Sequence, residues 1–215
     1  MIRFMCSPGA CVDIVSKSGK LLFAGLALGL SVSPVLAGEA EWETSARAVG
    51  ISELRAGVML HGVETTAAVL PNINSIDPNK WQNVNFEVLF RPPDVEFVRW
   101  LGSPRISLST TLNFAGRDSY ASLASVWHIP ILDTPFFFEP NIGVTVHNGY
   151  LHNPPPGRRQ LGCPALLNLG YNIGVNVSDR ITGVLTVEHS SSVWMCGPDN
   201  DGVNRVGIRV GYKLD

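Results

Sequence analysis

The stretch ALLNLGYNIGVN, residues 165–176, alternates strictly between two kinds of residue, and this alternation decides the fold. One set of positions is apolar throughout: Ala165, Leu167, Leu169, Tyr171, Ile173 and Val175. The other set holds small or polar residues: Asn168, Gly170, Asn172, Gly174 and Asn176. Because successive side chains of a β-strand point to opposite faces, the segment is predicted to be a strand with one continuous apolar face.

Seven further segments show the same pattern, and no stretch after residue 38 has a sustained helical period. The predicted strands are about nine to eleven residues long and lie near 54–61, 84–90, 105–114, 119–128, 136–147, 181–190 and 204–214. Segment 119–128 alternates poorly and is included because its neighbours need a strand between them. The chain is therefore predicted to be an all-β protein with eight antiparallel strands.

Composition bears on what the apolar faces contact. Charged residues make up 16% of the chain, fewer than in typical soluble domains, and the formal net charge of −2 leaves no basic surplus for nucleic acid. Eight strands long enough to cross a bilayer, with small polar residues on the inner face, favour a transmembrane β-barrel. Four tryptophans near predicted strand ends fit a membrane interface: Trp81, Trp100, Trp127 and Trp194. A soluble secreted barrel that binds a small hydrophobe is the alternative.

The N-terminus has the pattern of an export signal. Arg3, Lys17 and Lys20 precede the apolar run LLFAGLALGL, and small residues follow in Val35-Leu36-Ala37. The run is shorter than the roughly 20 residues of a spanning helix, so cleavage after Ala37 is expected. The predicted organisation is a signal peptide at 1–37 and a barrel at 38–215, with its first strand from about 52, in the bacterial outer membrane.

Removal of the signal takes Cys6 and Cys11 with it and leaves Cys163 and Cys196. Outer loops are predicted near 63–82, 115–118, 147–164 and 191–203, so both remaining cysteines fall in the last two of them. A disulfide between them is geometrically reasonable in an exported protein. A pair of free thiols is the alternative.

The segment TVEHSSSVW, residues 186–194, contains the strongest candidate for chemistry. His189 and Ser191 are two residues apart, so they share the strand's apolar face, which is an expensive place for polar groups in a membrane. A serine beside an imidazole can lose its proton and attack an ester carbonyl. Glu188 points to the other face, whereas Asn204 shares the outer face of the next strand. H-x-S spacing alone is also common in polar strand ends at the head-group level.

The segments EHSSS and NDGVNRVGIRVGY resemble the C-terminal signature of the outer-membrane lipid A deacylases, the acyloxyacyl-hydrolase-like lipid A 3-O-deacylase family. The family pattern is His-x-Ser-Asn, a short loop, Asn-x-Gly-x-Glu and a final strand. The resemblance extends upstream through SELRAGVMLHGV, PFFFEPNIGVTVHNG and LGCPALLNLGYNIGV, and covers most of residues 52–213.

By this resemblance, Ser191 is the expected nucleophile and His189 the general base. Asn200 corresponds to the asparagine that helps to stabilise the oxyanion, and Gly202 shapes the same turn. The position of the family's glutamate is occupied by Asn204, which completes the catalytic set His189, Ser191 and Asn204. The sequence does not decide whether Asn204 or Asp201 supports the ring.

The resemblance implies hydrolysis of an ester-linked acyl chain of lipopolysaccharide, at the 3-position of lipid A in the outer leaflet. A serine mechanism needs no cofactor, and the histidines lack the ligand spacing of a metal site. Ser192 replaces the family's asparagine after the serine. Because Asn204 and Ser192 depart from the pattern, a catalytically weak or inactive structural or lipid-binding barrel is the alternative. The oligomeric state stays open, with a homodimer among the alternatives.

Overall fold

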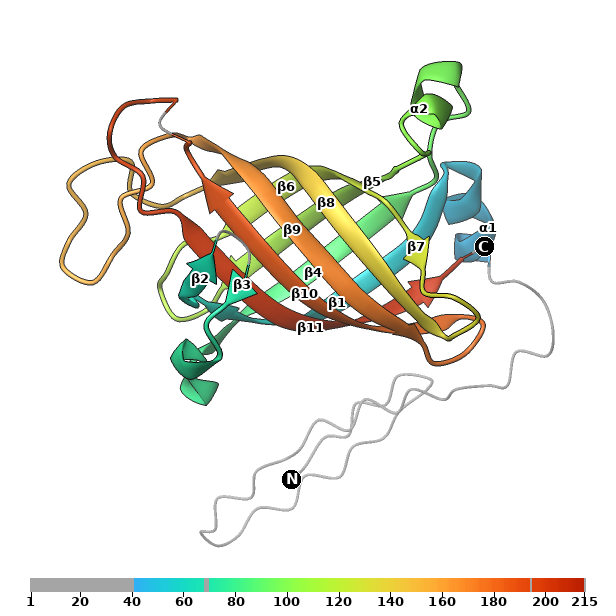
Figure 1. Ribbon diagram of the computed structural model, residues 1–215, viewed down its shortest axis with the longest axis horizontal. Helices are drawn as coiled ribbons and strands as arrows, with labels where there is room; N and C mark the ends of the chain where they lie inside the picture. The colour runs from blue at the N-terminus through green and yellow to red at the C-terminus, as the bar shows by residue number, and fades with distance from the viewer. Residues whose placement is uncertain (1–40, 68–69, 194, 215) are drawn as a thin grey trace, which may run out of the picture. The chain divides into compact units, whose positions relative to one another are not determined.

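The computed structural model of the chain describes residues 41–67, 70–193 and 195–214. The predicted signal peptide at 1–37 lies outside these residues. Eight long strands build the fold (Figure 1): β1 (Ile51–His61), β4 (Trp81–Phe90), β5 (Arg105–Asn113), β6 (Tyr120–Val126), β8 (Phe136–His147), β9 (Ala165–Asn176), β10 (Ile181–Ser191) and β11 (Val203–Lys213). The eight-strand prediction is confirmed, and so is the strand in the poorly alternating segment 119–128.

The strands close into an antiparallel barrel. Their order is β6-β5-β4-β1-β11-β10-β9-β8, and a further pairing between β6 and β8 closes the ring. The first and last strands pair along nearly their whole length, from Glu53 opposite Lys213 to His61 opposite Arg205. Closure leaves no free sheet edge, which is the arrangement that allows strands to cross a bilayer.

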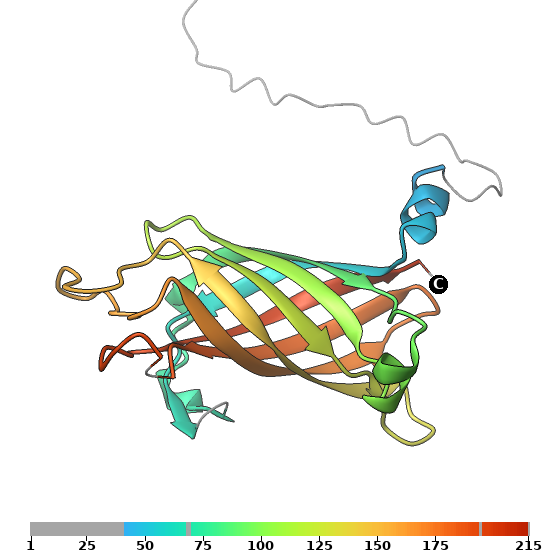
Figure 2. The same ribbon diagram turned by 90° about the horizontal axis from the view of Figure 1, so that it is seen from above.

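Short helices and strands lie at the two ends of the barrel (Figure 2). The β1–β4 connection contains β2 (Thr65–Ala67), β3 (Leu70–Pro71), η1 (Ile73–Ser75) and η2 (Pro78–Lys80). At the opposite end lie α1 (Glu41–Ala48), α2 (Glu96–Trp100) and β7 (Ile129–Pro130), the last paired with β8. The two α-helices were not predicted, because helices this short show no clear 3.6-residue period. No helix in the described part of the chain has the length and apolar character to cross a membrane.

The exterior of the barrel is apolar. Side chains from strands all around the ring are about half exposed, among them Phe86 (50%), Leu123 (57%), Val144 (51%) and Val210 (61%). A soluble protein rarely exposes a continuous apolar belt of this kind. The apolar faces of the strands therefore point outward to lipid. The alternative of a soluble secreted barrel does not fit this surface.

The interior of the barrel is filled by an ion-pair network. The guanidinium of Arg55 contacts Glu53 at 2.8 Å, Glu139 at 2.7 Å and Glu87 at 3.4 Å, and all four side chains are buried. Arg105 adds contacts to Glu53 and Glu139. Each carboxylate thereby has a cationic partner in a space from which bulk water is excluded.

The same network continues toward the other end of the barrel. Arg209 contacts Glu87 at 3.1 Å and Glu188 at 2.9 Å, and Arg205 contacts Glu188 at 2.9 Å. Glu188 thus points inward, as the alternation of its strand predicts. Paired charges therefore occupy the middle of the barrel interior.

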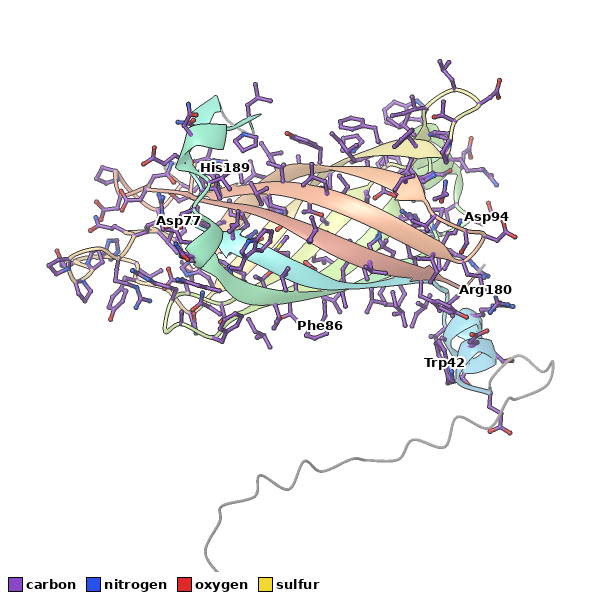
Figure 3. The ribbon with its side chains drawn as sticks, turned by 90° about the horizontal axis from the view of Figure 1, so that it is seen from below. Trp42, Asp77, Phe86, Asp94, Arg180 and His189 are labelled. Atoms are coloured by element: carbon purple, nitrogen blue, oxygen red, sulfur yellow. A yellow bond between two sulfur atoms is a disulfide. The ribbon has the colours of Figure 1, made fainter. Side chains whose placement is uncertain are left out.

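Helix α1 is tied to the end of the barrel by Glu43, which contacts Arg180 at 3.2 Å. The Tyr212 hydroxyl donates to Glu43 at 2.6 Å, and Trp42 packs against the Tyr212 ring. Figure 3 shows Trp42 and Arg180 at this same end. The Tyr212 hydrogen bond, helped by the charges of Arg180 and Arg47, lowers the pKa of the Glu43 carboxyl.

Replacement of Arg55 by methionine is expected to destabilise the barrel by about 3–5 kcal/mol, because it leaves three buried carboxylates short of a cation. Urea unfolding in lipid vesicles, followed by tryptophan fluorescence, measures the change. The matched control is Arg99→Met in α2, because Arg99 forms a solvent-exposed ion pair with Asp94. The expected change in the free energy of unfolding is within about 1 kcal/mol. Equal stability of the two variants would contradict a structural role for the network.

Candidate active site

His189 lies on the outer wall of the barrel, near the end that carries β2 and β3 (Figure 3), and Ser191 is two residues further along the same strand, β10. Their neighbours on β10 fix this orientation. Glu188 pairs with interior arginines, and the Ser190 hydroxyl donates to Asn168 inside the barrel at 2.8 Å. Because side chains alternate along a strand, His189 and Ser191 must point outward.

Asn204 is the cross-strand neighbour of His189 in the β10–β11 pair. Its Oδ1 lies 2.6 Å from His189 Nδ1. A carbonyl oxygen can only accept, so Nδ1 carries the proton and donates, and Nε2 keeps its lone pair. The other candidate, Asp201, is turned away, because its carboxylate accepts from the backbone N–H of Gln160 at 2.6 Å. The structure therefore gives Asn204 as the group that orients the ring.

Gly202 lies against both the His189 ring and Ser191. A Cβ at position 202 would lie 3.3 Å from His189 Cε1 and 3.6 Å from Ser191 Cβ. Glycine is also suited to this position because its φ is +59°. No hydrogen bond joins His189 to Ser191 among the described residues, and catalytic hydrogen bonds of this type often tighten only with substrate bound.

Asn200 is fixed to the peptide group that follows Ser191. Its Oδ1 accepts from the backbone N–H of Ser192 at 2.9 Å. The side-chain amide N–H groups of Asn200 have no hydrogen-bond partner within the described ranges, so they can donate to a ligand. The Ser192 hydroxyl donates to Asp199 O at 3.2 Å and helps to hold the same loop. The Asn200 side chain thus lies beside the peptide group that follows Ser191, and its amide is a candidate donor to an oxyanion.

A packed apolar cluster borders the pair on the outer wall. Val187 and Val206 face outward yet are only 2% and 7% exposed, because Leu60 and Val63 pack over them and Tyr171 lies alongside. Val63 belongs to the β1–β4 connection, which therefore covers part of the wall next to His189. This contact was not predicted, since the connection carries no periodic pattern.

On the other side of the pair, β9 contributes leucines. Leu169 is the cross-strand neighbour of His189, and Leu167 that of Ser191. The two polar side chains thus sit between an apolar strand and the Gly202 turn. The surroundings suit an acyl chain better than a polar substrate.

The β8–β9 and β10–β11 connections, which frame the pair, are joined to each other. Cys163 and Cys196 form a disulfide, with Cα atoms 5.5 Å apart. Arg159 Nη1 donates to the Gly202 carbonyl at 3.2 Å. His152 Nδ1 lies 2.7 Å from a carboxylate oxygen of Asp199. These contacts hold the turn that carries Asn200 and Gly202, and of them the sequence suggested only the disulfide.

The remaining histidines take other positions. His61 and His147 lie on the inner faces of their strands, as predicted, and His147 Nε2 contacts the Cys163 carbonyl at 2.7 Å. His128 Nδ1 lies 2.8 Å from Glu139 in the ion-pair network. None of these three is placed beside Ser191. The fold and the site together define a class of protein: a membrane β-barrel whose interior is filled by side chains and whose histidine–serine pair lies on the outer wall. Such a barrel is suited to act on lipids.

Comparison with known proteins identifies the family. The family model described as lipid A 3-O-deacylase (PagL) matches residues 87–213, more than half of the chain. The chain belongs to this family. The predicted membership and the predicted outer-membrane location are confirmed. No curated protein matches the sequence.

Solved structures of other proteins are similar to this chain. The crystal structure of the outer membrane enzyme PagL has 14% sequence identity and a TM-score of 0.50, covering 75% of this chain and 99% of that one. The N-terminal β-barrel domain of OprF from Pseudomonas aeruginosa has 11% identity, covers 76% and 98%, and gives a TM-score of 0.45. Neisserial surface protein A has 9% identity, covers 75% and 96%, and gives 0.42. The likeness to the PagL structure bears on the fold alone.

Proposed function

We propose that the protein is an esterase that removes the 3-O-linked acyl chain of lipid A, with Ser191 as nucleophile and His189 as general base. The observation that carries this proposal is the His189–Asn204 hydrogen bond on the outer wall, which occupies Nδ1 and leaves Nε2 as the nitrogen that can act as a base, two residues from Ser191 on the same strand face. Family membership supplies the substrate class. The location on the wall gives access to a substrate that stays in the membrane.

In the proposed reaction, His189 Nε2 takes the proton of the Ser191 hydroxyl as its oxygen attacks the acyl carbonyl carbon. The carbonyl oxygen becomes an oxyanion, which the Asn200 amide is placed to stabilise. The ester bond to the sugar then breaks, and the leaving sugar oxygen takes the proton from the imidazolium. Water, deprotonated by the same nitrogen, releases the fatty acid and restores Ser191.

The leucines of β9 support this reaction on one side of the pair. An acyl chain laid along the outer wall would pass Leu169 and Leu167, the cross-strand neighbours of His189 and Ser191. The ester carbonyl would then lie at the level of Ser191, the last residue of β10. No transfer of the chain into the barrel is needed.

Asn204 holds the ring in the reactive tautomer but carries no charge. An aspartate that supports a catalytic histidine also stabilises the imidazolium that forms, and its replacement by asparagine in a serine protease costs about 10⁴ in rate. We therefore expect slow turnover from this chain. An inactive lipid-binding barrel is the competing function, and the departure at Asn204 is the observation that favours it.

We also infer that residues 1–37 are an export signal removed before the barrel assembles. Its cleavage would leave Gly38 as the first residue of the mature chain. Mass spectrometry of protein purified from outer membranes tests this, and an intact Met1 in membrane-inserted protein would contradict it.

Ser191→Ala and His189→Ala are each expected to lower release of fatty acid from lipopolysaccharide by about 10²-fold, because either change removes the nucleophile or its base from a site that already lacks a charged third residue. Mass spectrometry of the lipid A products measures the loss. Ser190→Ala is the matched control: its hydroxyl faces the interior, so it should retain activity if the barrel folds. No release by the parent protein in any detergent or vesicle would favour the inactive barrel.

Asn204→Glu is expected to raise kcat by at least tenfold, because a carboxylate at this position would stabilise the imidazolium as well as orient the ring. Asn204→Ala should lower kcat, since the ring then loses its hydrogen-bond partner. Initial rates at saturating substrate measure both variants. An unchanged rate in both would show that position 204 does not act on His189.

A further inference from the structure

A cavity of about 180 Å³ opens at the end of the barrel that carries the β1–β4, β5–β6 and β8–β9 connections. Four cationic side chains line it: Lys80, Arg117, Arg158 and Arg159. Asp118 is the one carboxylate in its lining, and Arg158 pairs with it. Three positive charges in the lining thus remain without a carboxylate in the cavity, which is the signature of an anion site.

The cationic groups are held in place by the backbone. Arg117 donates to the Gly157 carbonyl, and Arg158 donates to the Gly116 carbonyl at 2.9 Å. Arg159 donates to the carbonyls of Asp201 and Gly202. A guanidinium has five N–H donors, so each arginine keeps others for a ligand. Donors fixed in advance in this way bind phosphate oxygens with little loss of side-chain entropy.

Unpartnered polar atoms lie in and beneath the cavity. His61 lines it, and His61 Nδ1 is buried with no hydrogen-bond partner. Tyr120 Oη and Arg205 Nη1 are likewise buried without partners, in side chains only 3% and 0% exposed. Tyr120 stacks on His61, and Arg205 is the cross-strand neighbour of His61. Buried donors without partners are rare in folded proteins and point to a missing ligand or ordered water.

Gly62 and Gly202 form the rim between the cavity and the candidate active site. Gly62 lines the cavity, and its N–H donates to the Asn204 carbonyl at 3.1 Å. Gly202, on the same rim, receives Arg159 from the cavity side and abuts His189 and Ser191 on the other. Neither glycine has a side chain to block a ligand that reaches across.

We propose that this cavity binds a phosphate group on the sugar headgroup of the lipid substrate while the acyl ester lies at Ser191. The proposal rests on the proposed function, and it adds the feature of the headgroup that the protein recognises. Lipid A carries phosphate esters on its sugars, and its sugars stand above the acyl chains at the membrane surface. A substrate whose chain follows the outer wall therefore brings its phosphate to the level of the cavity.

The test compares phosphorylated lipid A with the same lipid A after chemical removal of its phosphates. The parent protein should have a KM roughly ten- to hundredfold lower for the phosphorylated form, the range expected for charged hydrogen bonds. In the double variant Lys80→Gln/Arg117→Gln this ratio of KM values should fall toward one. Arg99→Gln removes the same kind of charge from α2 at the opposite end of the barrel, and should leave the ratio unchanged. A ratio that persists in the double variant overturns the proposal.

A binding experiment separates this proposal from the proposed function. Ser191→Ala protein in micelles is titrated with phosphorylated lipid A, with its dephosphorylated form and with inorganic phosphate, and binding is followed by calorimetry. Tighter binding of the phosphorylated lipid, lost in the triple variant that adds Lys80→Gln/Arg117→Gln, supports the headgroup site even if the parent proves inactive. Binding of inorganic phosphate that lipid A does not compete with would instead define a site for free phosphate and overturn the headgroup assignment. Mobility of unboiled protein on gels confirms that each variant is folded.

Discussion

The narrow interior of an eight-stranded barrel determines where this protein can work. Closing eight strands leaves room for side chains and little else. Here the space is taken by a balanced set of buried charges: Glu53, Glu87, Glu139 and Glu188 with Arg55, Arg105, Arg205 and Arg209. Such a network cannot open for an acyl chain without leaving charges unpaired. Chemistry on a lipid must therefore take place on the outer wall or at the rim.

The outer wall is costly for polar side chains, and the structure limits that cost. His189 satisfies one ring nitrogen through Asn204 on the adjacent strand. Ser191 ends β10, so it lies at the edge of the wall rather than at the middle of the bilayer. Val63 and the connection that contains it cover the wall just below the pair. The polar site thus lies at the level of the membrane where the strands end and the loops begin. The ester bond that joins an acyl chain to the sugar of a lipid lies at the same level.

The alternation of apolar and polar residues predicted the barrel because it indicates both the strands and the direction of their side chains. A two-residue repeat identifies a strand and assigns each side chain to a face. It therefore also predicted that His189 faces outward and Glu188 inward, and both were confirmed by their partners. Asn204 could be placed beside His189 for the same reason, since it lies on the outer face of the neighbouring strand.

Contacts between loops could not be predicted in this way. Arg159 and Gly202 are 43 residues apart in two irregular connections, and no periodic signal relates them. The packing of Val63 on Val187 could not be predicted either, because Val63 also lies in an irregular connection. The Cys163–Cys196 disulfide was left open because spacing in sequence does not set the distance between two loops. The cationic cavity depends on three such connections, so it appears only once they are placed in space.

A neutral residue at position 204 has a physical consequence for the proposed reaction. Asn204 is 7% exposed beside an apolar wall, where an amide costs far less to bury than a carboxylate. The imidazolium that forms on His189 would then lack a counter-charge from the protein, because Glu188 is committed to Arg205 and Arg209 inside the barrel. A phosphate held across the Gly62 and Gly202 rim would bring a negative charge with the substrate itself. In that arrangement a substrate without phosphate would lose rate as well as affinity, since the charge that favours proton transfer would leave with it.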